Sequence, residues 1–381
     1  MCELRVPFNR AAVAINQIDY VADSMQSGRI AGDGPFTQKA SKLLSKLHED
    51  NPVLLTTSCT SALEMCALLL NISEGDEVIV PSFTFVSSAN AFALLGAKIV
   101  FVDIDPTTWN LDVNEVKIAI GQKTKAIVAV NYAGLASVTA DLLQVAQNAG
   151  VPIVEDNAHG LFSQEDGRAL GTSSAISTLS FHETKNVTCG EGGALVINDP
   201  SLLDRAEIIR EKGTNRSQFF RGMIDKYTWI DKGSSFLLSD INAAMLLAQL
   251  EDATLIQERR QVAFCSYMSE LGEWAEKHGI VLPSRLGSGT GSFHMFPILM
   301  PNLESRTRLI EFTKSFDVGL AFHYVPLHSS SAGLRFGKVI SLCSTTNDVS
   351  DRLVRLPLFS DIKPRDVERV IETVLAFNNF G

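Results

Sequence analysis

Lys185 lies where a side-chain amine could do chemistry. It follows the apolar run Ile176–Phe181 by four residues and precedes the glycine-rich segment 190–193, where backbone segments can approach closely. A lysine on a tight loop at the edge of a sheet, shielded by apolar side chains, can have a lowered pKa and act as a nucleophile. The alternative is an exposed loop lysine, because most lysines lie at the surface.

Asp156 is a second candidate, because it ends the apolar segment that begins at Val151. A carboxylate at the end of a buried strand needs a cationic or hydrogen-bonding partner. A protonated pyridine nitrogen would serve as that partner. The alternative role is an N-cap for the turn that follows.

Small polar residues and one aromatic ring complete the set. Ser58-Cys59-Thr60 opens the predicted helix Ser61–Leu70. The free backbone N–H groups at the start of this helix can bind an anion. The alternative is that Ser58 only caps the helix. Ser180 could add a hydroxyl group to the same anion. Phe85 follows a predicted strand and could stack on a flat ring, although core packing is the usual role of a phenylalanine.

Taken together, these groups suit one ligand. A phosphate-binding turn, a stacking ring, a carboxylate for a ring nitrogen and a lysine amine describe pyridoxal 5′-phosphate (PLP), bound to the lysine as a Schiff base.

The elements that must position these residues alternate along the chain. Short apolar, β-branched runs predict strands, and longer amphipathic runs between them predict helices, which together favour an α/β fold with a mostly parallel sheet. Ligands of such sheets bind beyond the carboxyl ends of the strands, where the candidates lie. The predicted strands are Val53–Thr57, Glu77–Val80, Lys98–Asp103, Ala126–Asn131, Pro152–Glu155, Ile176–Phe181 and Ala194–Asn198, and the helices are Ser61–Leu70, Ser87–Leu95, Val113–Ile120 and Thr139–Ala149.

The pattern changes after Asp199. A helix is predicted over Ser201–Glu211, followed by a polar loop to about Ser239, helical patterns over 241–276, a flexible connection over 287–292, and short strands and helices to the end. We therefore predict a large PLP-binding domain with an N-terminal arm over residues 1–245. A smaller α+β domain is predicted over residues 246–381.

Composition narrows the class of partner. The 381 residues carry a formal net charge of −10, which argues against nucleic-acid binding. No apolar stretch reaches the roughly 20 residues of a membrane helix, and no signal peptide is apparent. Six scattered cysteines without metal-ligand spacing indicate reduced thiols, no bound metal and a cytoplasmic protein. One short basic loop, Arg210–Trp229, has five basic and two acidic residues, and Lys212 and Arg216 are its predicted diphosphate contacts.

Four motifs, in their order along the chain, resemble the DegT/DnrJ/StrS family of sugar-nucleotide aminotransferases. They are Ser58–Leu63, Pro81–Phe85, Glu155–Gly160 and Ser180–Asn186, and the resemblance covers nearly the whole chain. Segments 211–222, 225–229 and 322–328 are most similar to the subgroup that makes TDP-4-amino-4,6-dideoxygalactose for enterobacterial common antigen.

This resemblance implies the type I, aspartate-aminotransferase-like PLP fold and a homodimer with active sites at the subunit interface. The substrates would be a TDP-4-keto-6-deoxy sugar and L-glutamate. Lys185 would bind PLP and move the proton, and Asp156 would keep the pyridine nitrogen protonated. The other implied roles are ring stacking by Phe85, phosphate binding by Cys59, Thr60 and Ser180, and substrate contacts by His323 and Tyr324 that reach across from the partner subunit.

Three positions depart from the broad family pattern. Cys59 replaces a common glycine but keeps its backbone N–H. His159 stands where many members have a glutamine near the ring hydroxyl, and imidazole can also donate a hydrogen bond. Ser235 replaces an asparagine that reaches the partner's cofactor phosphate.

Other functions remain open at this stage. A related sugar dehydratase would have histidine in place of Lys185. An aminotransferase that acts at C3 of the sugar, or one that gives the opposite stereoisomer at C4, would differ from a 4-aminotransferase of this subgroup by only a few substitutions. An NAD-dependent enzyme predicts Gly-x-Gly-x-x-Gly after the first strand, but residues 56–61 contain no glycine. A non-catalytic PLP-binding regulator is the remaining alternative.

Overall fold

The computed structural model describes residues 4–283 and 291–378. Its central sheet has the strand order β1-β9-β8-β5-β4-β2-β3-β12. Strand β9 is antiparallel to both neighbours, and the other pairs of this sheet are parallel, which confirms the predicted mostly parallel α/β sheet. The strands are β1 Val53–Thr56, β2 Glu77–Pro81, β3 Lys98–Val102, β4 Thr124–Val130, β5 Ile153–Asp156, β8 Ile176–Ser180, β9 Gly193–Ile197 and β12 Gly337–Val339.

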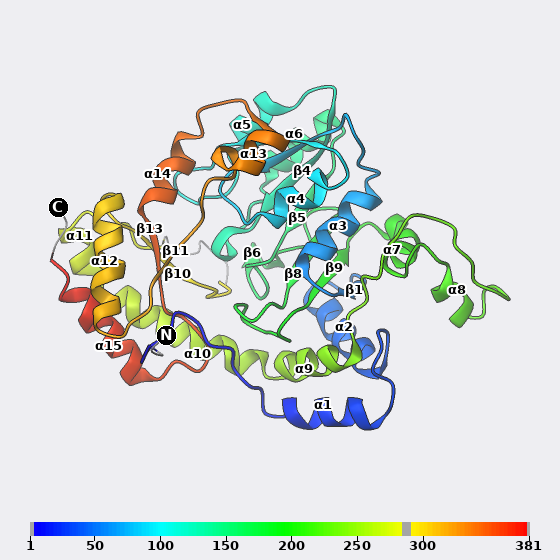
Figure 1. Ribbon diagram of the computed structural model, residues 1–381, viewed down its shortest axis with the longest axis horizontal. Coiled ribbons are helices and arrows are strands. Elements are labelled where there is room, and N and C mark those ends of the chain that lie inside the picture. The colour runs from blue at the N-terminus through cyan, green and yellow to red at the C-terminus, as the bar shows by residue number, and fades with distance from the viewer. Residues whose placement is uncertain (1–3, 284–290, 379–381) are drawn as a thin grey trace.

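Helices cover both faces of this sheet (Figure 1). Val78 and Val80 belong to the apolar cluster shared with α3 and α4, whereas Ile79 belongs to the cluster shared with α5 and α6. Successive side chains of a strand point to opposite faces, so a strand that is apolar at every position is buried on both sides. The helices are α1 Gln17–Gln26, α2 Pro35–Leu47, α3 Cys59–Leu69, α4 Ser87–Ala93, α5 Val113–Ala119, α6 Ala140–Ala149, α7 Leu203–Arg210, α8 Arg216–Phe220 and α9 Asp240–Glu251.

A second core forms around a small antiparallel sheet with the order β10-β13-β11. Helices α9 and α10 follow one another and connect this part to the large sheet (Figure 1). The predicted boundary between the two domains, at residue 245, falls within α9 and stays a prediction. The remaining elements are α10 Ala253–Glu270, α11 Gly272–Lys277, β10 Phe296–Leu299, α12 Leu303–Ser315, β11 Ala321–Phe322, α13 Ser331–Phe336, α14 Ser344–Arg352, β13 Leu353–Leu356 and α15 Pro364–Leu375, besides a hairpin of β6 Gln164–Glu165 and β7 Arg168–Ala169.

Three segments differ from the sequence prediction. The predicted polar loop before Ser239 contains helix α8, and β12 from the C-terminal part extends the large sheet by pairing with β3. Most of the predicted flexible connection over 287–292 lies outside the described residues. Its last residue, Ser292, is fully buried and makes two hydrogen bonds. Its N–H donates to Ser163 Oγ (2.8 Å), and its hydroxyl donates to the His159 carbonyl (2.8 Å).

Arg260 on α10 anchors this part of the chain. Its side chain is buried and donates hydrogen bonds to the carbonyl oxygens of Phe293 (2.9 Å), His294 (2.6 Å) and Leu358 (3.1 Å). We expect Arg260→Met to lower the free energy of unfolding by about 3 kcal/mol, because the three carbonyl oxygens lose the charged guanidinium group that donates to them. Urea unfolding measures this, and Arg259→Met, which removes a half-exposed pairing with Asp361, is the matched control. Equal losses in both variants would contradict the prediction.

Candidate active site

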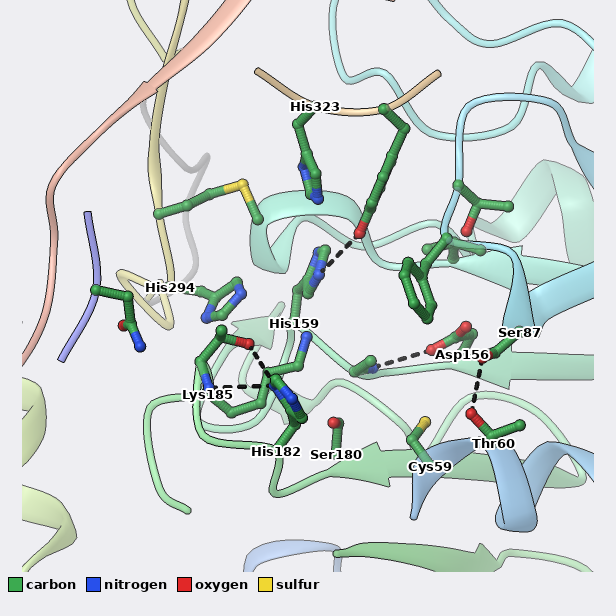
Figure 2. Close-up of a pocket in the computed structure, with 18 of the residues that line it drawn as sticks. Cys59, Thr60, Ser87, Asp156, His159, Ser180, His182, Lys185, His294 and His323 are labelled. Carbon is green, nitrogen blue, oxygen red and sulfur yellow. Dashed lines mark hydrogen bonds between the residues drawn. The ribbon is translucent and has the colours of Figure 1, made fainter. Parts of the chain in front are cut away.

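A cavity of about 580 Å³ opens at the carboxyl ends of the parallel strands. Its walls come from the loops after β1, β2, β5 and β8 and from β13 and the chain around Tyr324. The cavity therefore lies between the large sheet and the small one. Figure 2 shows that Lys185, Asp156, Ser180 and the start of α3 surround it.

Lys185 lies on the loop between β8 and β9 and lines the cavity. Its amide N–H donates to the His182 carbonyl (2.9 Å), which forms a tight turn. Burial lowers the pKa of the Lys185 amine to about 8, although the negative charge of Asp156 acts in the opposite direction. The amine is thus closer to its neutral, nucleophilic form at physiological pH than an exposed lysine.

Asp156 ends β5 on the far side of the cavity and is buried. One carboxylate oxygen accepts a hydrogen bond from Ser88 Oγ (2.7 Å), and the other accepts the Ala158 N–H (3.2 Å). Burial raises the pKa of this carboxyl group despite these two donors and Lys185. A cation bound against Asp156 would keep it ionised.

The start of α3 forms one end of the cavity. Ser58 caps the helix by accepting the Ser61 N–H (3.0 Å), and the first N–H groups of a helix have no partner within it, so those of Cys59 and Thr60 are available to an anion. A Cβ on Gly193 would lie 2.3 Å from Cys59 N, so glycine is required where β9 passes this turn. The Cys59 thiol donates to Thr178 Oγ1 (3.5 Å), which leaves only its backbone for the anion.

Two more predicted residues complete this wall. Ser180 ends β8 next to the α3 turn and lines the cavity, and Thr60 shares a hydrogen bond with Ser87 (2.7 Å). Phe85 also lines the cavity and is 56% exposed, whereas its neighbour Phe83 is buried in the core. The structure therefore leaves the ring of Phe85 free to stack on a bound ligand.

Aromatic and imidazole rings form the opposite wall. His159 stacks on His294 with ring centres 4.6 Å apart, and its Nε2 lies 3.4 Å from the Tyr324 hydroxyl (Figure 2). His323 Nδ1 lies 3.0 Å from the Tyr132 hydroxyl. Burial lowers the pKa values of all three histidines well below the usual range, so they are neutral at physiological pH.

This arrangement corrects one sequence-based expectation. His323 and Tyr324 lie in the cavity of their own chain, together with Lys185, and contact Tyr132 and His159. The prediction that they reach across from the partner subunit is therefore wrong.

Lys212, Arg216 and Ser235 lie together but do not line the cavity. Lys212 (3.3 Å) and Arg216 (3.0 Å) both pair with the buried carboxylate of Glu211, whose backbone pairs with that of Ser235. This cluster belongs to the segment with α7 and α8, which projects away from the C-terminal elements (Figure 1). Within one chain the cluster therefore forms no part of the site.

Among the residues that sequence reasoning missed are His294 and Arg355, which line the cavity, and Ser88, which lies behind its wall and donates a hydrogen bond to Asp156. Ser88 is a buried member of α4, and its bond to Asp156 had no local signal. His294 precedes β10 and comes near His159 only through the tertiary fold. Arg355 did have a signal, because it is the one charged residue of the apolar segment 353–359.

The residues present fit PLP. The buried carboxylate of Asp156 suits a protonated ring nitrogen, and the turn at Cys59 and Thr60 suits a phosphate. His159 Nδ1 is buried without a hydrogen-bond partner in the described part of the chain, which suits a polar group of the ring. Lys185 provides the amine.

Comparison with known proteins identifies the family. The sequence model of the DegT/DnrJ/EryC1/StrS aminotransferase family matches residues 13–375. The chain belongs to this family. Its members depend on PLP, so this chain is a PLP-dependent aminotransferase with the fold that its motifs predict.

Relatives match the chain over nearly its whole length. An uncharacterized protein from Methanocaldococcus jannaschii, MJ1066, is 30% identical over 97% of this chain and 96% of its own length. The crystal structure of the aminotransferase TlmJ from Streptoalloteichus hindustanus has a TM-score of 0.88 at 29% identity, covering 97% of this chain and 98% of that one. The putative sugar aminotransferase Spr1654 from Streptococcus pneumoniae, in its PMP form, has a TM-score of 0.89 at 26% identity, with the same coverage of 97% and 98%. In the described part of this aminotransferase, no helix is long and apolar enough to cross a membrane.

The lowered pKa of Lys185 predicts how the apoenzyme takes up PLP at different pH values. Below about pH 8 the fraction of Lys185 with a neutral amine increases about tenfold for each pH unit. The rate of covalent PLP uptake should therefore rise with pH and level off above about pH 8. An unshifted lysine would continue to gain rate toward its ordinary pKa of about 10.4. Rapid mixing with PLP, followed by borohydride trapping and mass analysis of the Lys185 peptide, measures this rate. A rate that still rises between pH 9 and 10 would contradict the prediction.

Proposed function

We propose that the enzyme transfers the amino group of L-glutamate to a nucleotide-linked 4-keto-6-deoxy sugar. The acceptor is TDP-4-keto-6-deoxyglucose, and the products are TDP-4-amino-4,6-dideoxygalactose and 2-oxoglutarate. The observation that carries this proposal is the cavity in which Lys185 and Asp156 lie with His323 and Tyr324, a pair from the subgroup-like segment 322–328. The likeness to a putative sugar aminotransferase supports a sugar as the acceptor.

PLP supplies the electron-accepting ring on which amino groups are exchanged. Asp156 would hold a proton on the ring nitrogen, the N–H groups of Cys59 and Thr60 would bind the phosphate together with Ser180, and Phe85 would cover one face. Lys185 would take the proton from the donor carbon that bears the amine and pass it to the cofactor. In the opposite sense it would deliver a proton to the sugar carbon that gains the amine, because its own amine is adjacent and has a pKa near the working pH.

A homodimer with shared sites is part of this proposal. Apolar side chains stand exposed on α1, just before it, and on the segment around α8, which suits burial against a second copy. They include Ile15, Ile18, Met25, Phe220, Met223 and Trp229. In the dimer, the hydroxyl of Ser235 would reach the cofactor phosphate in the partner's cavity. Lys212 and Arg216 would reach the nucleotide diphosphate in the same cavity. The enzyme would act in the bacterial cytoplasm, supplying polysaccharides such as enterobacterial common antigen or O-antigen.

Product analysis tests the acceptor and the stereochemistry. Purified holoenzyme is incubated with L-glutamate and TDP-4-keto-6-deoxyglucose, and the sugar product is identified by NMR. A 4-amino-galactose product supports the proposal, whereas the glucose stereoisomer or a 3-amino sugar would replace it. Inertness toward all nucleotide keto sugars would favour the PLP-binding regulator.

Neutralising Lys212 and Arg216 tests their predicted role. We expect the double change to glutamine to raise the KM for the nucleotide sugar at least about tenfold, because each charged hydrogen bond to phosphate is worth about 1.5–3 kcal/mol. The single-turnover reaction with glutamate should keep its rate. Glu211→Gln is the matched control: it frees both cations from their shared carboxylate and should leave this KM unchanged or lower it. Equal damage to both half-reactions would refute the role.

A further inference from the structure

His294 lies in the cavity without a role in the function described so far. It precedes β10, is largely buried and lines the cavity. Its ring stacks on that of His159, with ring centres 4.6 Å apart. Figure 2 shows His294 on the same side of the cavity as Lys185 and on the opposite side from Thr60. His294 therefore belongs to the reacting end of the site rather than to its phosphate end.

The hydrogen bonds of Asn186 fix the orientation of its own amide. The carbonyl oxygen of Ser292 can only accept, so the two side chains that face it present nitrogen atoms, Asn186 Nδ2 (2.5 Å) and Gln257 Nε2 (3.0 Å). Asn186 Nδ2 also donates to Gln257 Oε1 (2.8 Å). The atom that faces His294 Nδ1, at 2.9 Å, is therefore the amide oxygen of Asn186.

This oxygen decides which nitrogen of His294 carries the hydrogen. An amide oxygen only accepts, so His294 Nδ1 is the donor. Burial, helped by the positive charge of Lys185, holds the pKa of His294 well below its usual range, so the ring carries no second hydrogen. His294 Nε2 is therefore a neutral acceptor, and no hydrogen bond is made to it within residues 4–283 and 291–378.

A neutral acceptor near Lys185 suits one of the two substrates better than the other. In ionised glutamate, the carbon that carries the amine is bonded to a carboxylate and a CH2 group, and neither can donate a hydrogen bond. In the keto sugar, the carbons next to the C4 carbonyl are C3, which carries a hydroxyl group, and C5, which carries a methyl group. Because C4 must lie beside Lys185, the C3 hydroxyl is the donor that comes nearest to this wall.

We propose that His294 Nε2 accepts a hydrogen bond from the C3 hydroxyl of the sugar. This contact turns C4 toward Lys185 and selects sugars that keep the hydroxyl over 3-deoxy sugars, because a polar group that loses its partner in a closed site is costly. Asn186 acts through His294, since it holds the tautomer in which Nε2 is free to accept. The inference rests on the proposed function in that the acceptor is a 4-keto sugar.

Two variants of the holoenzyme test this contact with two sugars. His294→Asn keeps an amide N–H for Asn186 but has no atom at the position of Nε2, whereas His294→Gln places an amide near that position. We expect His294→Asn to lower kcat/KM for TDP-4-keto-6-deoxyglucose about tenfold or more. The value for TDP-4-keto-3,6-dideoxyglucose, which lacks the C3 hydroxyl, should change by less than about threefold. His294→Gln should recover part of the loss, and the single-turnover rate with L-glutamate should stay within about threefold in both variants.

NMR of enzyme labelled with 15N-histidine gives a readout that does not depend on turnover. The signals of His294 are assigned by their absence in His294→Asn. We expect Nδ1 to carry the hydrogen and Nε2 to carry none. Binding of the 4-amino sugar product should shift the Nε2 signal toward that of a hydrogen-bonded acceptor, and the 3-deoxy product should not.

Four outcomes would overturn the proposal. Equal losses with both sugars would leave His294 only its packing against His159. An equal loss in the reaction with glutamate would assign the lone pair to Lys185. A hydrogen on Nε2 would remove the acceptor. If the unmodified enzyme reacts with glutamate but with neither sugar, the proposed function fails and this subsite fails with it, whereas normal turnover with equal losses refutes the subsite alone.

Discussion

Lys185→Ala is expected to lower the rates of both half-reactions by at least about 10³-fold. A positioned general base contributes about 10²–10⁴-fold, and this residue also forms the covalent bond to the cofactor. Its amine is the one lysine amine on the described cavity wall. Stopped-flow absorbance with L-glutamate alone, and then with the keto sugar, measures the two steps separately.

Lys185→Arg is the matched control, because it keeps a cation near Asp156 but has no amine that is neutral at working pH. It should be as inactive as the alanine variant while still binding PLP without a covalent bond. Added methylamine should restore part of the proton transfer to Lys185→Ala but not to Lys185→Arg. Activity within about tenfold of the unmodified enzyme in either variant would refute the assignment.

Asp156→Asn is expected to weaken PLP binding and to slow both half-reactions by about 10²–10³-fold. Removing one partner of a buried ion pair costs about 3–5 kcal/mol, and about 1.4 kcal/mol corresponds to a factor of ten. An amide cannot hold a proton on the ring nitrogen, although its oxygen can still accept the Ala158 N–H and its NH2 group can donate to the Ser88 hydroxyl. Absorbance titration of the apoenzyme with PLP, together with single-turnover rates, measures both effects.

The same substitution should have the opposite effect on the apoenzyme. Burial raises the pKa of Asp156 above its unfolded value, so the ionised carboxylate destabilises the folded apoenzyme at neutral pH. This cost begins to shrink as the pH falls through the raised pKa of the folded protein, and it is gone once the pH lies below the ordinary pKa of the unfolded chain. Asp156→Asn should therefore raise the Tm of the apoenzyme at pH 7.5, with a difference that shrinks toward acidic pH, and lower the Tm of the holoenzyme. A lower apoenzyme Tm at every pH would contradict this account.

The sequence determined the local elements of the large sheet and the residues that follow its strands. The predicted runs became β1 to β5, β8 and β9 with ends shifted by at most two residues. Their pattern is local, because apolar runs bury both faces of a strand and Ser58 can cap α3 from within its own segment. The parallel order then placed Asp156 and Ser180 at one edge, since β5 and β8 are neighbours in register.

Tertiary structure decided which charges are paired and which face the cavity. The sequence showed a basic loop, but only the fold places the carboxylate of Glu211 where it is buried and pairs with both Lys212 and Arg216. Only the docking of the small sheet brings Arg355 and His294 to the same cavity as Lys185, more than 100 residues away in sequence. Local periodicity can place a side chain on one face of a strand, but what that face meets depends on how distant elements pack.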